Sequence, residues 1–226
     1  MTVIEELQAL SDPGNARFTA KLTPGLDPST LLGCRIPRLR QLARRLRGSV
    51  EAAHFIETLP HRYHDENNLH GLLLGQIRDT PQALEAVERF LPHIDNWATC
   101  DITASAMTAL GRNPESVMPH IERWLRATHA YTVRFGIVVL LGHYLGEGFE
   151  PRHLALVADM RSDEYYINMA RAWYFSTALA KQYNAAMPYF TERRLDRWTH
   201  NKSLQKARES FRVSPDRKIR LQQLKY

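Results

Sequence analysis

The chain has 226 residues, of which 44% are hydrophobic, and this composition is typical of a folded globular protein with a sizeable core. Thirty Lys and Arg residues against 24 Asp and Glu give a formal charge of +6, which favours an acidic partner such as nucleic acid or an anionic membrane surface. The longest apolar run, from Phe135 to Gly142, is far shorter than the roughly 20 residues that span a bilayer. The N-terminus lacks the pattern of a secretory signal. We therefore expect a cytoplasmic protein, associated with the nucleoid if its source is bacterial.

Helical periodicity recurs along the chain, whereas strand patterns are almost absent. Two apolar stripes at helical spacing each follow a proline: Leu39, Leu42, Ala43 and Leu46 after Pro37, and Leu84, Val87, Phe90 and Leu91 after Pro81. Proline suits the first turn of a helix because its missing N–H group has no intrahelical partner there. The pattern predicts an all-α fold.

Beyond residue 60 the expected helices come in pairs. The second helix of each pair is expected to open near Asp65, Asn96, Tyr131, Tyr165 and Asn201, at intervals of 31, 35, 34 and 36 residues. This period is typical of an α-solenoid, in which each helix pair buries its apolar face against its neighbours and the second helices line a concave inner side. We therefore expect one repeat domain over residues 1–226, and we interpret the DEN stretch that starts at Asp65 as the N-cap of its inner helix.

Several of these inner helices contain residues that ordinary helix packing does not readily explain. Trp97 and Asp101 lie one helical turn apart in NWATCD, Arg134 lies in YTVRFGIVVLL, and Trp173 lies in YYINMARAWYFSTALAK. The last inner helix, NKSLQKARESFR, carries Lys202, Lys206, Arg208 and Arg212. The inner surface is thus predicted to be aromatic and basic, with a carboxylate in its middle.

Each of these residues also has a purely structural interpretation. A Trp at helical spacing usually packs in a core, and an Asp in the first two turns complements the helix dipole. An isolated Arg most often lies on the surface or in an ion pair. The run Arg35, Arg38, Arg40, Arg44, Arg45 and Arg47 is either a solvated helix face or a set of phosphate contacts, and the absence of an intervening acid favours the second interpretation.

At these residues the sequence resembles the AlkD-like DNA alkylation repair family, which consists of HEAT-like-repeat DNA glycosylases that excise N3- and N7-alkylated purines. Its members carry Trp-x-x-x-Asp at the start of one inner helix, an Arg on the next and a second Trp on the one after. Trp97, Asp101, Arg134 and Trp173 match these positions. Trp124 and Trp198 match nothing in the family pattern and are assigned to the core or an interface.

Two further stretches extend the resemblance over nearly the whole chain. LLGCRIPRLRQLAR is similar to the family's LG-x-x-x-P-x-x-R segment, and NKSLQKARES is similar to its final inner helix. Phe18 departs from the pattern, because the best-known type of member has a Tyr there. A Phe keeps a face for stacking but lacks the hydroxyl, so no hydrogen bond is expected from it.

The resemblance implies a HEAT-like solenoid with a concave, positively charged inner face that binds alkylated double-stranded DNA as a monomer. It implies catalytic roles for Asp101, Trp97 and Trp173, because a cationic alkylpurine is already an activated leaving group and the enzyme has only to stabilise positive charge developing on the sugar. The residues expected to contact DNA are Arg134, Phe18, Arg38, Arg40, Lys202 and Lys206.

No cofactor and no metal are expected. Cys34 and Cys100 form no CxxC pattern, and His61, His64 and His70 lack metal-ligand spacing with an acidic partner. Two other functions stay open at this point: a catalytically inactive HEAT-like DNA-binding protein, and a protein-binding helical-repeat scaffold. The aromatic and carboxylate residues favour the enzyme over the DNA-binding protein, and the basic inner helices favour either of these over the scaffold.

Overall fold

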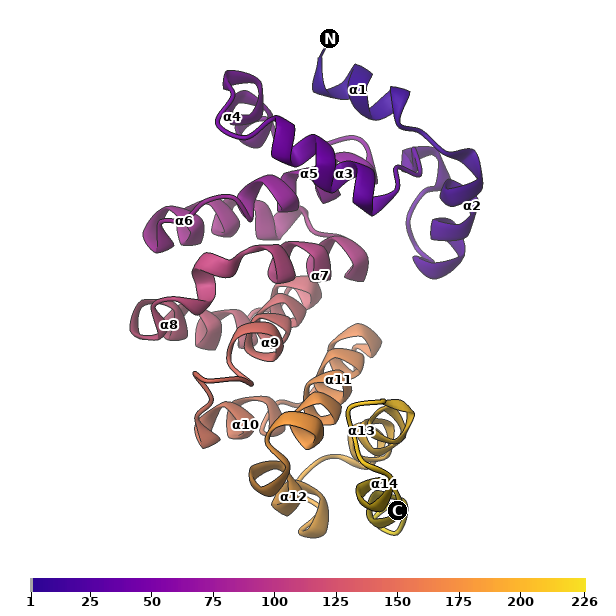
Figure 1. The fold of residues 1–226 in the computed structure, drawn as a ribbon, viewed down its shortest axis with the longest axis vertical. Helices are drawn as coiled ribbons and strands as arrows, with labels where there is room; N and C mark the ends of the chain where they lie inside the picture. The colour runs from indigo at the N-terminus through magenta and orange to yellow at the C-terminus, as the bar shows by residue number, and fades with distance from the viewer. Residues whose placement is uncertain (1) are drawn as a thin grey trace. The chain divides into compact units, whose positions relative to one another are not determined.

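The computed structural model describes residues 2–226, and the regular structure of this range is entirely helical, which confirms the all-α prediction (Figure 1). The chain divides into two compact units, Met1–Ser116 and Val117–Tyr226. Within residues 2–226, no helix combines the length and the apolar character needed to cross a membrane.

In the N-terminal unit, α5 is the central helix, because it packs against both α3 and α7 and also contacts α1, α4 and α6. The helices of this unit are α1 (Val3–Ala9), α2 (Pro13–Leu22), α3 (Ile36–Arg45), α4 (Val50–Glu57), α5 (His64–Leu74), α6 (Thr80–Phe90) and α7 (Trp97–Ala106). Short 3₁₀ turns lie at η1 (Pro28–Thr30), η2 (Leu91–His93) and η3 (Thr108–Gly111).

Side-chain caps and buried stripes explain why these segments are helical. Asp12, Ser49, Asp79 and Asn96 each accept a hydrogen bond from a backbone N–H group three residues further on. Both apolar stripes predicted from the sequence are buried, and no residue in either is more than 6% exposed. The stripes thus form the apolar faces of α3 and α6.

A glycine sets the distance between α5 and α7. A Cβ atom added to Gly71 would overlap the side chain of Thr103 and press on its backbone, so any larger residue would push the two helices apart. The close packing also brings the two helix starts together, since His64 Nδ1 lies 3.2 Å from Asn96 Nδ2.

The interpretation of Asp65 as an N-cap is wrong. The helix α5 begins at His64, with Tyr63 as its N-cap residue, and Asp65 lies within the first turn. The N–H group of Tyr63 is satisfied instead by the Glu66 carboxylate at 2.7 Å. The sequence pattern pointed to the right turn of the helix but to the wrong acidic residue.

The Asp65 carboxylate, whose residue is 1% exposed, holds the loop that precedes α3. Its oxygens accept hydrogen bonds from the backbone N–H groups of Leu32 at 2.8 Å and Cys34 at 2.6 Å, and more weakly from Gly33 at 3.3 Å. Gly33 has a φ of 78°, and a side chain there would overlap the backbone of Asp12 and Ala16. Asp65 and Gly33 together therefore fix the loop against the start of α2.

In the C-terminal unit, α11 is the central helix, because it packs against α9 and α13 and also contacts α10 and α12. The helices are α8 (Pro114–Leu125), whose first three residues precede the unit boundary, α9 (Ala130–His143), α10 (Pro151–Ala158), α11 (Tyr165–Lys181), α12 (Tyr183–Thr191), α13 (Arg197–Glu209) and α14 (Pro215–Gln222). Trp124 is 2% exposed and meets Phe135 edge to face at 5.1 Å between ring centroids, so it belongs to the core, as one of its two assignments predicted.

The expected start of the last inner helix at Asn201 is wrong by one turn. Helix α13 begins at Arg197, and Asp196 caps it by accepting a hydrogen bond from the Thr199 N–H group at 2.9 Å. It ends at Glu209, so Arg212 lies beyond it. With this correction, the second helices begin at residues 64, 97, 130, 165 and 197, at intervals of 32 to 35 residues.

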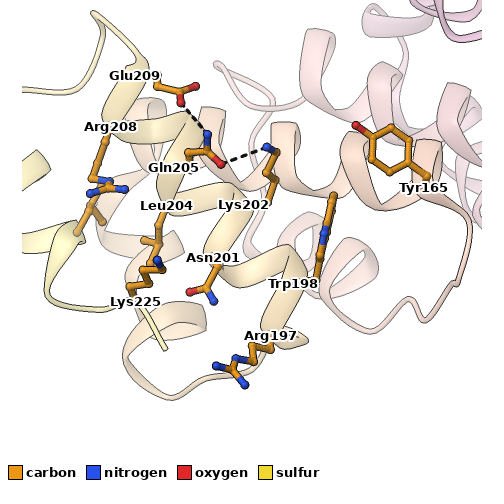
Figure 2. A pocket seen from close by; sticks show the side chains of 11 residues that line it. Tyr165, Arg197, Trp198, Asn201, Lys202, Leu204, Gln205, Arg208, Glu209 and Lys225 are labelled. Atoms are coloured by element: carbon orange, nitrogen blue, oxygen red, sulfur yellow. Dashed lines mark hydrogen bonds between the residues drawn. The ribbon is translucent and has the colours of Figure 1, made fainter.

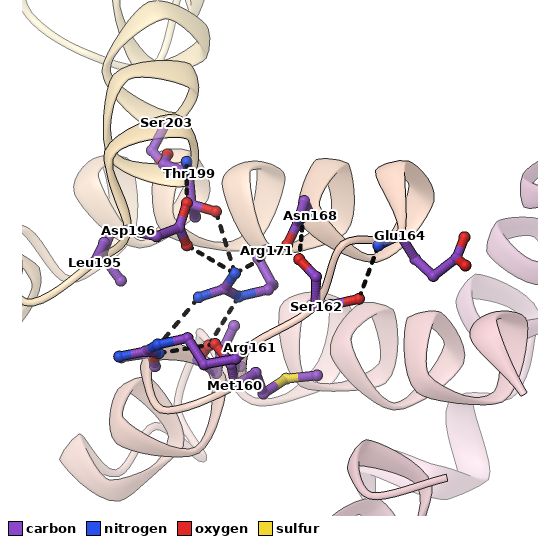
Figure 3. Close-up of polar contacts among 12 residues, drawn as sticks. Met160, Arg161, Ser162, Glu164, Asn168, Arg171, Leu195, Asp196, Thr199 and Ser203 are labelled. Carbon is purple, nitrogen blue, oxygen red and sulfur yellow. Dashed lines mark hydrogen bonds and ion pairs between the residues drawn. The ribbon is translucent and has the colours of Figure 1, made fainter. Parts of the chain in front are cut away.

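A buried arginine joins α11 to α13 and to the end of α10 (Figure 3). The Arg171 residue is 1% exposed, and its Nη1 atom donates to Asp196 Oδ2 at 2.9 Å, while Nε donates to the Val157 carbonyl at 3.3 Å. Burial raises the pKa of Asp196, but hydrogen bonds from Thr199 and the charge of Arg171 outweigh it and hold that pKa below its usual value. The cap of α13 is therefore kept ionised by the same network that ties the helices together.

Candidate nucleic-acid interface

The N-terminal unit contains a cavity of about 460 Å³ between α2, the loop before α3, and the first turns of α5 and α7. Phe18, Trp97 and Asp101 all line it. Three of the residues predicted from the sequence, which come from two helices almost 80 residues apart, are thus brought to one site. We call this the aromatic–carboxylate cavity.

The indole of Trp97 is held in place by a hydrogen bond. Its Nε1 atom donates to the backbone carbonyl of Leu22, the last residue of α2, at 2.9 Å. Trp97 is also the first residue of α7, directly after the N-cap Asn96, whose side chain accepts a hydrogen bond from the Thr99 N–H group at 2.9 Å. The ring is half-buried and is fixed at both its backbone and its nitrogen.

Asp101 follows Trp97 by one turn of α7 and is also half-buried, so both side chains reach the cavity from the same helix face. Phe18 enters from α2 and is 59% exposed, which is unusual for a large apolar ring and leaves its face accessible from solution. The cavity therefore offers two aromatic rings and one carboxylate to a bound molecule.

His64 also lines the cavity, but its ring nitrogens are engaged by the protein. The Thr99 hydroxyl donates to Asn68 Oδ1, so the amide nitrogen of Asn68 must face His64 Nε2, at 2.9 Å, and donate to it. The proton of the neutral ring then lies on Nδ1, where the Thr99 hydroxyl oxygen at 3.4 Å is the acceptor, because Asn96 Nδ2 is itself a donor. Burial lowers the pKa of His64, so the ring is a neutral structural link and not a proton donor.

Two of the arginines between residues 35 and 47 are paired with carboxylates of the same unit, and phosphate binding by the run stays a prediction. Arg35 lines the cavity but pairs with Asp12 at 2.9 Å, and Arg45 pairs with Glu6. The sequence contains no acid within the run, but α1 and the start of α2 bring these two carboxylates to it. Arg38 lines a separate hollow of about 300 Å³ beside Arg45, and Arg40 is exposed on the same helix.

In the C-terminal unit, Trp173 and Lys206 line one hollow of about 300 Å³ between α11 and α13. Burial lowers the pKa of Lys206, and the positive charges of Lys202 and Arg134 lower it further. Three of the predicted DNA-binding residues, Arg134, Lys202 and Lys206, are therefore close enough to interact electrostatically. We call them the C-terminal cationic cluster.

Arg134 is more deeply placed than expected. The residue is 6% exposed, and its Nη1 atom donates to the Tyr166 carbonyl in the first turn of α11 at 2.8 Å. Its guanidinium thus contributes to the packing of α9 on α11, in addition to the positive charge that it places near Lys206. The phosphate contact of Arg134 stays a prediction.

Two features of the structure had no clear signal in the sequence. One is the buried set of His64, Asn68, Asn96 and Thr99 behind the aromatic–carboxylate cavity, which depends on the register of α5 against α7. The other is Trp198, which is 43% exposed on α13 and is therefore not a core residue.

The chain belongs to the DNA alkylation repair enzyme family, whose sequence model matches residues 3–211. The match covers every helix from α1 to α13 and leaves out α14. No curated protein matches the chain. Membership in the family means that this is a DNA alkylation repair protein, with DNA as its substrate, and it confirms the resemblance inferred from Trp97, Asp101, Arg134 and Trp173.

Proposed function

We propose that this chain is a monofunctional DNA glycosylase that excises cationic N3- and N7-alkylpurines from duplex DNA without a cofactor. The observation that carries the proposal is the aromatic–carboxylate cavity, in which Trp97 and Asp101 lie together and Phe18 faces them from another helix. Family membership supports a role in alkylation repair, and the cavity supports this particular chemistry.

The chemistry needs negative charge and π-electron density near the deoxyribose. An alkylpurine with a formal positive charge leaves as a neutral base, so the positive charge moves onto the sugar as the glycosidic bond breaks. Asp101 stabilises that charge and orients the attacking water, while the Trp97 ring contributes a cation–π attraction of roughly 0.5 to 2 kcal/mol. The hydrogen bond from Trp97 to Leu22 holds the indole ring in position in the absence of substrate.

Neutral damaged bases are poor substrates in this account. Such a base must be protonated before it leaves, and His64, the histidine beside Trp97 and Asp101, is neutral and already bonded to Asn68. The site is therefore expected to act on bases that already carry a formal positive charge.

We assign DNA binding to the C-terminal cationic cluster, to the exposed Arg38 and Arg40, and to the Phe18 ring. Phosphate contacts of this kind give affinity without sequence specificity. The interval of 32 to 35 residues between second helices supports the proposal that the chain is a single domain of HEAT-like repeats with a basic inner face, acting as a monomer. A catalytic role for Trp173 rests on the resemblance, and Trp173→Ala tests it separately.

Incubation of the protein with a duplex that contains one N7-methylguanine tests the proposal. We expect free N7-methylguanine and an abasic site, and no release from an otherwise identical duplex that contains hypoxanthine. Duplex binding without release would identify a DNA-binding protein without glycosylase activity. The absence of both binding and release would leave a protein-binding scaffold.

A further inference from the structure

A second hollow, of about 910 Å³, lies in the C-terminal unit where the start of α11 meets α13 and the segment around α14 (Figure 2). Tyr165 and Trp198 line it, together with four cationic side chains, from Arg197, Lys202, Arg208 and Lys225. Lys202 also belongs to the C-terminal cationic cluster, whereas Tyr165, Trp198 and Arg197 have no part in the function proposed above. We call this hollow the Tyr–Trp cleft.

The two aromatic rings of the cleft are accessible from solution. Tyr165 is 57% exposed and Trp198 is 43% exposed, and their ring centroids lie 6.2 Å apart at an interplanar angle of 69°. Both rings also line a neighbouring hollow of about 450 Å³ that includes Arg161. The rings thus line two hollows, of which the larger is mainly cationic and the smaller contains Asp163 and Asp196 as well as arginines.

The charge of the cleft is complementary to an anion. Glu209 is the acidic residue among those that line the hollow, and its carboxylate accepts a hydrogen bond from Gln205 at 2.9 Å. Lys202 Nζ donates to the same Gln205 at 3.1 Å (Figure 2). Arg208 Nε is buried without a hydrogen-bond partner among residues 2–226. With four cationic side chains against one carboxylate, the lining of the cleft attracts an anionic ligand.

We propose that the Tyr–Trp cleft binds an unpaired nucleotide of single-stranded DNA, with its base stacked on Trp198 or Tyr165 and its phosphates near Arg197 and Lys202. A base exposes its flat face only when it is unpaired, and proteins that bind single strands combine such rings with a basic groove. An acidic peptide would use the cations but not the rings. This site goes beyond the proposed excision of bases and does not depend on it.

Fluorescence anisotropy of a labelled oligothymidylate, compared with a labelled duplex, tests the proposal. Trp198→Ala should weaken binding of the single strand by roughly 5- to 150-fold, the range expected for the loss of one stacked base. Trp198→Phe keeps a ring and should retain most of the affinity. Phe211→Ala is the matched control, because Phe211 is fully exposed in the same unit but lies outside the cleft.

A second pair of variants tests the charges. Arg197→Ala should lower the slope of log affinity against log salt by about 0.7 for single strands, the value for one phosphate contact. Arg220→Ala removes the same charge from α14, outside the cleft, and should leave the slope unchanged. Melting temperatures near that of the wild-type protein would show that the variants are folded.

The proposal is overturned if folded Trp198→Ala binds the single strand as tightly as wild type, or if the wild-type protein does not bind it at low salt. An equal loss in Phe211→Ala would also overturn it. Release of N7-methylguanine from duplex DNA is measured on the same variants, and we expect it to stay within about twofold of wild type. Failure of the cleft and failure of the glycosylase proposal are thus read from different experiments.

Discussion

Acid should destabilise this protein through a buried pair of histidines in the N-terminal unit. His61 Nε2 and His70 Nδ1 lie 2.9 Å apart, and the two side chains are about as inaccessible as core residues. The His61 ring stacks on Phe55 of α4 at 4.4 Å, and the His70 ring stacks on Phe90 of α6 at 4.0 Å. Protonation of either ring would place a charge in surroundings that are largely apolar, although the Glu66 carboxylate lies 3.9 Å from His61 Nδ1.

The pKa values of both rings set the size of the effect. Burial, reinforced by the positive charge of His93, lowers the pKa of His61 to about 4, and burial together with His61 lowers that of His70 to about 3. Both lie below the value of about 6.5 for an unfolded chain, so the unfolded state binds more protons as pH falls. Their contribution is fully present above about pH 6.5 and is lost progressively on acidification toward pH 3 to 4.

Each pH unit in this window costs about 1.4 kcal/mol per histidine. At about pH 5 the pair should therefore lower the free energy of unfolding by roughly 4 kcal/mol, which is a large share of the 5 to 15 kcal/mol typical of a domain. Urea denaturation followed by circular dichroism, at several pH values between about 5 and 7.5, measures this free energy directly.

A variant with both histidines replaced separates the pair from other titrating groups. In His61→Gln with His70→Asn, each amide places a hydrogen-bonding atom near the ring nitrogen that it replaces, but neither amide titrates. The pH slope should become much flatter in this variant and stay unchanged in the control His54→Gln, because His54 is exposed. A wild-type stability that does not change between pH 7 and pH 5 would refute the reasoning.

Three further outcomes follow from the packing and the charges. Gly71→Ala should lower the free energy of unfolding by about 1 to 3 kcal/mol, because the added Cβ would collide with Thr103. Gly142 faces open space, so Gly142→Ala should leave the free energy of unfolding unchanged or raise it. Chemical denaturation of both variants measures these changes. Arg171→Met should cost roughly 3 kcal/mol in the same assay, because it removes the hydrogen bond to the buried Val157 carbonyl and the ion pair with Asp196; an unchanged midpoint would contradict this. Lys206→Ala should weaken duplex binding for every sequence and reduce the salt slope by about 0.9, and an unchanged slope would remove Lys206 from the interface.

Local patterns were sufficient to predict several of the helices. The stripe after Pro37 and the start of α11 at Tyr165 follow from the periodicity of nearby residues, and the structure confirms both. The start of α13 was misplaced because Asp196, its cap, lies in a polar and basic stretch with no apolar stripe directly after it.

Contacts between distant residues were not predictable in the same way. The sequence offered no sign that Asp65 would bind backbone N–H groups more than 30 residues away, or that Asp12 would pair with Arg35. Such contacts depend on how the helices pack, which local spacing does not determine. Trp97 and Asp101 could be paired from the sequence because they lie one helical turn apart. That Phe18 lines the same cavity could be seen only from the tertiary structure.

The most direct test of the proposed function is the rate of base release by Asp101→Asn. This change keeps the shape of the side chain and removes its charge, so single-turnover release of N7-methylguanine should fall by roughly 10²- to 10⁴-fold, with the affinity for duplex DNA little changed. A change in rate without a change in binding would identify Asp101 as the group that stabilises the developing positive charge. A well-folded Asp101→Asn protein that releases the base at the wild-type rate would contradict the account.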